Sequence, residues 1–233
     1  MTKEDYKLQL WKEYLEANKW MNTADKAVLE QIGLLYLEKV EVLYRFYQAV
    51  MEGEVQKSDE QTGLKYYRKG EYYVLSRKEN TCRLTPEQLK EYLQMMIELF
   101  EDIHPLGTVV DLKKEELKEK LPVDELEQIR MVITHRYIGA GEHGAYFPYG
   151  ATIYPIGMPG ENKILNFTPA LIEKVVHEGF RDEQEEAYVY LMKQELLIKK
   201  KQKSMGFASE EECRKYNDYL KRGGHTPDAE NRE

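Results

Sequence analysis

The sequence predicts an α+β protein in which a small, mostly antiparallel sheet is flanked by N-terminal and C-terminal helices. Apolar residues recur at spacings of three and four along both ends of the chain, which is typical of amphipathic helices. Apolar runs of strand length lie between Gly107 and Phe180. Glycines and prolines separate these runs at short intervals, which favours antiparallel strands joined by turns.

We expect the chain to divide into four regions. Residues 1–104 form an N-terminal helical region that includes a candidate hairpin at 64–76, where two apolar runs flank Lys-Gly. Residues 105–182 form a small β-rich domain. Residues 183–224 form C-terminal helices, and the polar residues 225–233 form a disordered tail.

The N-terminal region is predicted to begin with two helices. Residues 4–21 carry one apolar stripe. Residues 24–52 are predicted to form one long helix that is apolar on more than one side and therefore needs partners on more than one side. Gly53 ends this helix, and the polar stretch 53–70 is predicted to be a loop, within which 64–67 could form the first strand of the candidate hairpin.

Three further helices are predicted from their capping signals. Thr85 is a good N-cap, Pro86 suits the first helical position and Gln88 completes a capping box. Asp182 and Ser209 each have a glutamate three residues later, so both are predicted to cap helices of the C-terminal region.

The β-rich domain is predicted to contain six short strands, with proline separating several of them. The strands are predicted at 108–112, 130–138, 145–147, 151–154, 163–167 and 175–178. The charged segment 113–120 is predicted to be a helical insert between the first two.

Composition argues against several classes of partner. The formal net charge of −8 disfavours a nucleic-acid backbone. No apolar run approaches the ~20 residues of a membrane span, and the N-terminus lacks the apolar core of a signal peptide. Cys82 and Cys213 match no zinc or disulfide pattern. We therefore expect a cytoplasmic protein with no nucleic-acid and no membrane partner.

The sequence predicts no catalytic residues, no cofactor and no metal site, and hence no enzyme. Gly139 to Gly144 match GxGxxG, but the following Ala-Tyr-Phe-Pro-Tyr cannot open the helix that a dinucleotide site needs, so a hairpin or loop is predicted. His135, His143 and His177 lack the short spacings of metal ligands. An enzyme with a dispersed site, combining His135 or His177 with carboxylates, is kept as an alternative.

Tyrosine content and the long apolar helix favour protein binding instead. The chain has 18 tyrosines, a residue that suits both sheets and interfaces. A homo-oligomer is one way to cover the helix. The candidate interaction residues are Leu35, Tyr36, Leu43, Tyr47, Tyr146, Phe147, Tyr149 and Tyr154.

The β-rich region carries an ordered set of short motifs. It opens with Pro-Leu-Gly-Thr-Val-Val-Asp-Leu-Lys at 105–113 and continues through the strand 130–138, a Tyr-Pro-Ile-Gly turn at 154–157 and Asn166-Phe167. It closes with Ile-Glu-Lys-Val followed by Glu-Gly-Phe-Arg-Asp-Glu, at 172–183. In this order and spacing it resembles a small domain-of-unknown-function family of Gram-positive bacteria.

That resemblance implies a binding function. Genes for such domains lie beside those for LXG toxins in type VIIb secretion clusters, which implies a cytosolic adaptor or chaperone-like protein that binds an LXG-type toxin or another type VII substrate before export. It implies no cofactor and no chemistry. An immunity protein that binds the toxin's catalytic domain is the alternative. The chain departs from the family in its insert at 113–128, and its helical arms lie outside the resemblance.

Overall fold

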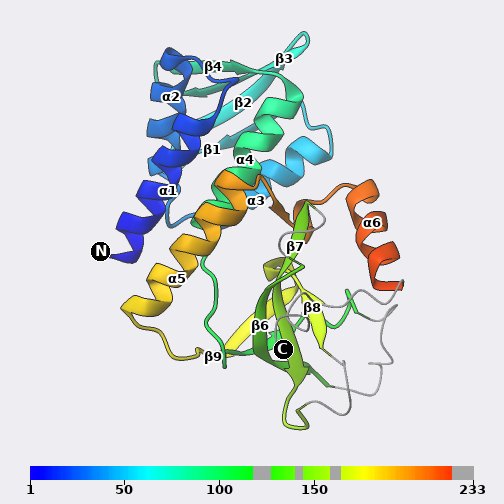
Figure 1. The fold of residues 1–233 in the computed structure, drawn as a ribbon. Helices are drawn as coiled ribbons and strands as arrows, with labels where there is room; N and C mark the ends of the chain where they lie inside the picture. The colour runs from blue at the N-terminus through cyan, green and yellow to red at the C-terminus, as the bar shows by residue number, and fades with distance from the viewer. Residues whose placement is uncertain (118–126, 140–143, 158–163, 222–233) are drawn as a thin grey trace. The chain divides into compact units, whose positions relative to one another are not determined.

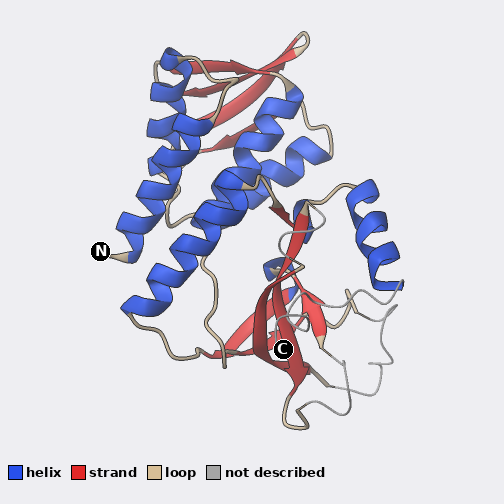
Figure 2. Cartoon of the chain, in the orientation of Figure 1, coloured by secondary structure: helices blue, strands red, loops and turns tan. Residues whose placement is uncertain are grey.

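The computed structural model describes residues 1–117, 127–139, 144–157 and 164–221. The chain divides into two units. The N-terminal unit comprises Met1–Asp102 and Glu186–Lys199, and the β-rich unit comprises Ile103–Glu185 and Lys200–Glu233. Each unit combines helices with antiparallel strands, so the predicted α+β class is confirmed (Figure 2).

Helices of the N-terminal unit surround an aromatic core centred on Trp11. Its ring is fully buried and packs against Tyr14, Tyr92 and Phe100 at centroid distances of 5.4–5.6 Å. The helices are α1 (Lys3–Ala17), α2 (Thr23–Leu34), α3 (Val40–Met51) and α4 (Pro86–Phe100), joined by α5 (Glu183–Lys193), which begins in the β-rich unit, and by the π-helical turn Gln194–Lys199. In the part of the chain that is described, no helix is long and apolar enough to cross a membrane.

The single helix predicted at 24–52 is wrong, because the chain breaks between Leu34 and Val40. At the break, Tyr36 turns fully into the core, and its hydroxyl lies 2.5 Å from Oγ1 of Thr62 and 3.4 Å from a carboxylate oxygen of Asp59. Burial of this aromatic ring, together with its polar contacts, outweighs the local helical periodicity.

A four-stranded antiparallel sheet completes the N-terminal unit (Figure 1). Its strands, in sheet order, are β1 (Gln56–Asp59), β2 (Leu64–Lys69), β3 (Tyr72–Arg77) and β4 (Asn80–Leu84). The predicted hairpin at 64–76 is confirmed. The loop predicted at 53–70 is wrong at 56–59, which form β1. None of the residues of β1 is fully buried, so its sequence Gln-Lys-Ser-Asp has no apolar residue that would indicate a strand.

The β-rich unit contains a second, six-stranded sheet. In sheet order β10-β7-β6-β5-β9, with β8 also paired to β7, all pairs are antiparallel except β10–β7. The strands are β5 (Val109–Leu112), β6 (Ile129–Ile138), β7 (Ala145–Ile153), β8 (Leu165–Phe167), β9 (Ile172–His177) and β10 (Lys203–Ser204), and the helix is α6 (Glu210–Lys221).

Two strands predicted on either side of Pro148 are one strand, β7. Proline has no backbone N–H to donate to a neighbouring strand, so a strand tolerates it where no neighbouring strand accepts a hydrogen bond at that position. On the edge of β7 away from β6, Ala145 and Tyr146 pair with β10, and pairing with β8 begins only at Tyr149. Pro148 therefore occupies the gap between these two partners.

Other predictions differ from the structure in their limits. The last strand begins at Ile172 rather than Val175. Residues 113–117 form a turn rather than a helix, and residues 118–120 of the predicted insert lie outside the described residues, as does the predicted tail 225–233. The predicted caps at Thr85, Asp182 and Ser209 are confirmed by hydrogen bonds from backbone amides three residues later.

Buried charges lie at the end of α4 in the N-terminal unit. Nζ of Lys193 donates hydrogen bonds to the backbone carbonyls of Leu99 and Glu101. The Glu101 carboxylate accepts from the hydroxyl of Tyr44 at 2.9 and 3.0 Å. Burial raises the pKa of Glu101 to about 7, although the bond from Tyr44 and the charge of Lys193 oppose this. Burial and the charge of Lys7 lower the pKa of Lys193 to about 8.

The raised pKa of Glu101 predicts a stability loss as pH increases. Between the ordinary value of 4.5 and about 7, the folded chain holds a proton that the unfolded chain has lost, so the free energy of unfolding falls by about 1.4 kcal/mol per pH unit. Glu101→Gln removes this titration. Compared with the unsubstituted protein, it should gain about 2–3 kcal/mol between about pH 5 and pH 7.5 in denaturant unfolding. Glu41→Gln on α3, at an exposed carboxyl, is the control; equal profiles for all three proteins would contradict the assignment.

Candidate functional site

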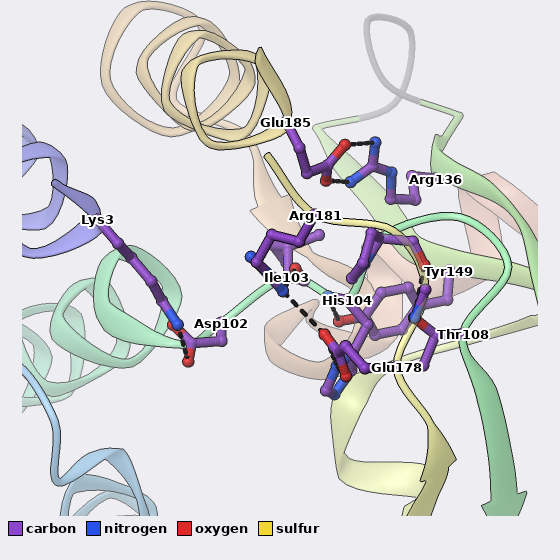
Figure 3. A network of polar contacts seen from close by, with 12 residues as sticks. Lys3, Asp102, Ile103, His104, Thr108, Arg136, Tyr149, Glu178, Arg181 and Glu185 are labelled. Atoms are coloured by element: carbon purple, nitrogen blue, oxygen red, sulfur yellow. Dashed lines mark hydrogen bonds and ion pairs between the residues drawn. The ribbon is translucent and has the colours of Figure 1, made fainter. Parts of the chain in front are cut away.

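Polar contacts tie together the two segments through which the chain enters and leaves the β-rich unit (Figure 3). We term these residues the clasp: His104, Thr108, Tyr149, Glu178 and Arg181. The backbone N–H of His104 donates to the hydroxyl of Tyr149 at 3.0 Å, and Nδ1 of His104 lies 3.2 Å from Glu178. Because Tyr149 belongs to β7, the entering segment is held against the sheet.

Arg181 completes the charged part of the clasp. Its Nη2 donates to Glu178 at 3.0 Å and to the backbone carbonyl of Ile103 at 2.9 Å. Partial burial acts to raise the pKa of Glu178, but the hydrogen bonds and charges of Arg181 and His104 outweigh it and lower that pKa. Glu178 is therefore an acceptor at neutral pH, and the arrangement holds two chain segments together rather than preparing a proton donor.

Backbone contact between the two segments is unusually close. Oγ1 of Thr108 donates to the carbonyl of Pro105 at 2.7 Å and accepts from the N–H of Gly179 at 3.0 Å. A Cβ atom at position 179 would lie 2.2 Å from the carbonyl oxygen of Leu106. Only glycine fits at this crossing, since any side chain would force the backbones apart.

A second pair of charges fixes the start of α5. Arg136 of β6 forms a bidentate ion pair with Glu185, with its Nη2 at 3.1 Å from Oε2 (Figure 3). The N–H of Glu185 donates to the carboxylate of Asp182, which caps the helix. Bidentate arginine–carboxylate pairs set orientation as well as distance, so the leaving segment has a defined path.

Apolar side chains are exposed around the clasp. We term Leu106 and Phe180 the Phe180 surface. Phe180 is 81% exposed and Leu106 is 50% exposed, and the contact at Gly179 brings their segments together. Val175 and Val176 are exposed on β9, the last strand in the sheet order. These two valines are successive strand residues and point to opposite faces of the sheet, so Leu106 and Phe180 are the exposed apolar side chains at the crossing. Exposed large apolar side chains are typical of interaction sites.

The structure distributes the eight predicted interaction residues over both units. In the N-terminal unit Tyr36 and Leu43 are fully buried, and Leu35 and Tyr47 are partly exposed. In the β-rich unit, three of the other four lie on β7 and Tyr154 follows it directly. Tyr146 and Tyr149 are buried, Phe147 is partly exposed and packs against Tyr216, and Tyr154 is 51% exposed. Tyr154 alone among the eight is exposed.

The sequence did not single out His104, Arg181 or Phe180. A signal was available, because the motifs that open and close the β-rich region each contain a glycine beside an apolar residue. The motif ends meet in space at Gly179 and Leu106. The sequence pattern that predicts helices and strands does not predict that two segments about 70 residues apart contact each other through their backbones.

The residues considered as catalytic or metal ligands form no common cluster among the described residues. His135 contacts Thr134, and His177 is exposed on β9, whereas His143 lies outside the described residues. Residues 140–143, at the centre of the GxGxxG match for which a hairpin or loop is predicted, lie outside the described residues; the flanking strands β6 and β7 are antiparallel. Burial raises the pKa of Cys82 to about 12. Within the described ranges, no three His, Cys, Asp or Glu side chains are placed to hold a metal ion.

The close approach at Gly179 predicts a destabilising substitution. Gly179→Ala should lower the free energy of unfolding by about 2 kcal/mol or more, because the new methyl group overlaps the carbonyl of Leu106. Gly206→Ala is the matched control, since its Cβ would meet nothing nearer than 3.6 Å. Thermal melting of both variants tests this; equal melting temperatures would show that the segments do not cross as described.

Comparison with known proteins identifies one family. Neither the curated proteins nor the solved structures compared with this chain gave a match. Residues 103–188 match a family described as Domain of unknown function (DUF4176). The matched range begins and ends at the two segments joined by the clasp and contains the whole Phe180 surface. The chain therefore contains a DUF4176 domain, whose entry and exit are held together by His104, Glu178 and Arg181.

Proposed function

We propose that this chain is a cytosolic adaptor or chaperone-like protein that binds a type VIIb-secreted LXG-type toxin. The exposed Phe180 surface is the observation that carries the proposal. A phenylalanine with 81% of its area in water forgoes the free energy of burial, which is about 2–3 kcal/mol for such a side chain. A partner that covers it recovers this free energy, and aromatic anchors dominate many protein interfaces.

Rigid support strengthens the case for Phe180 as an anchor. Its neighbours on both sides are fixed, Gly179 by the N–H bond to Thr108 and Arg181 by bonds to Glu178 and Ile103. A side chain held on an ordered backbone loses less conformational entropy on binding than one on a free loop. The clasp thus presents Phe180 in a defined position.

The partner class is supported by the family resemblance. The motifs that carry it, at 105–113 and 178–183, are the segments that meet at the clasp and flank Phe180. The match to DUF4176 over the same region agrees with that placement. A protein-binding role also suits a domain whose charged residues at the clasp are engaged in holding the backbone.

Phe180→Asp tests the proposal. A tagged chain co-expressed with the LXG toxin encoded beside it should retain the toxin, and Phe180→Asp should reduce retention at least about tenfold, because a carboxylate cannot enter an apolar interface without losing its hydration. Val55→Asp, at another exposed apolar residue, is the control and should retain the toxin. Unchanged melting would show that both variants are folded. Normal retention by Phe180→Asp, or none by the unsubstituted chain, would contradict the proposal.

Co-expression with each half of the toxin distinguishes the immunity alternative. An adaptor should bind the N-terminal export region and be needed for export. An immunity protein should bind the C-terminal catalytic domain and protect the cell while leaving export unchanged.

A further inference from the structure

The sheet of the N-terminal unit has one face covered by helices and one face without such cover (Figure 1). Side chains of Leu64, Tyr66, Leu75, Cys82 and Leu84 are buried on the covered face, where α2, α3 and α4 pack. Successive residues of a strand point to opposite faces. The strand residues that alternate with these buried ones therefore point to the other face, which we call the outer face.

Strand register places cations and tyrosines together on that outer face. Lys65 is paired with Ser76 across β2 and β3, Tyr67 with Val74, and Lys69 with Tyr72. Val74 is paired in turn with Arg83 of β4. Directly paired residues share a face, so Lys65, Tyr67, Lys69, Tyr72, Ser76 and Arg83 make up one surface, which we term the Lys-Tyr face.

The charge of this face is opposite to that of the chain. The outward positions of the four strands include no aspartate or glutamate, whereas the chain as a whole has a formal net charge of −8. Among the described residues, none forms an ion pair or a side-chain hydrogen bond with Lys65, Lys69 or Arg83, and all three are exposed. The cations are therefore available to a partner.

Ser76 adds an independent observation. Its side chain is only 4% exposed, and Oγ has no hydrogen-bond partner in the described part of the chain. It lies in the row between Lys65 and Thr81. A buried hydroxyl without a partner costs about 1–3 kcal/mol, and a ligand group that reaches Oγ of Ser76 would supply the missing bond.

We infer that the Lys-Tyr face binds an acidic segment of a partner polypeptide. Lys65, Lys69 and Arg83 pair with its carboxylates, and Tyr67 and Tyr72, both substantially exposed, pack against its backbone and apolar groups. The sheet spans about 15 by 20 Å, from the spacing of strands and residues, which fits a helix of about three turns or a short extended segment.

A polypeptide fits this face better than a nucleic acid. A long polyanion extends beyond the face and meets the rest of a chain that is net negative, which disfavours backbone-driven binding. A short acidic segment can end at the edge of the sheet. This surface lies in the N-terminal unit and is independent of the toxin contact proposed for Phe180.

Binding of a fluorescent deca-glutamate peptide to the full chain tests the inference. The triple variant Lys65→Ala/Lys69→Ala/Arg83→Ala should bind about tenfold more weakly, since three exposed ion pairs contribute together about 1–2 kcal/mol. The matched control Lys12→Ala/Lys19→Ala/Arg45→Ala removes the same charge from exposed positions outside the sheet and should bind as the unsubstituted chain does. Binding should weaken as salt concentration rises.

Three outcomes would overturn the inference. The first is that the peptide does not bind. The second is that peptide binding is weakened equally in the two triple variants, and the third is that a ten-nucleotide single-stranded DNA binds more tightly than the peptide. Melting of each variant, which should match that of the unsubstituted chain, shows that the comparison is made between folded proteins.

Discussion

The crossing of Gly179 and Leu106 is the constraint on which the β-rich unit depends. There the segment that enters the unit and the segment that leaves it touch through their backbones, and a single methyl group would separate them. The hydrogen bond from the Gly179 N–H to Thr108 and the contacts of Glu178 with His104 and Arg181 hold the crossing in place. This contact joins the two ends of the unit, and Phe180, next to the crossing, is 81% exposed.

Local signals predicted much of the secondary structure. Thr85, Asp182 and Ser209 cap helices as their sequences indicate, and the hairpin at 64–76 follows from its turn residues. Tertiary contacts decide the remainder. Tyr36 breaks a helical pattern to reach the core, and Pro148 remains within a strand because two different partners border it. The polar strand β1 carries no apolar signal of its own.

The candidate sites were harder to predict than the fold. Tyr36, Leu43 and Tyr149 suggested a binding surface by residue type, yet burial places them within the chain's own core. Phe180 was one residue in a motif until its exposure distinguished it. The Lys-Tyr face required the register of four strands, which alternation alone does not give because a shift of one residue exchanges the two faces.

The DUF4176 domain holds the exposed Phe180 on a fixed backbone, and we propose that this side chain anchors a partner. Hydrogen–deuterium exchange of the full chain, with and without the LXG-type toxin that we propose as its partner, tests this proposal most directly. The account predicts slower exchange on complex formation at the segments 104–108 and 172–181, which carry the Phe180 surface. A complex that forms while exchange in both segments stays unchanged would contradict it.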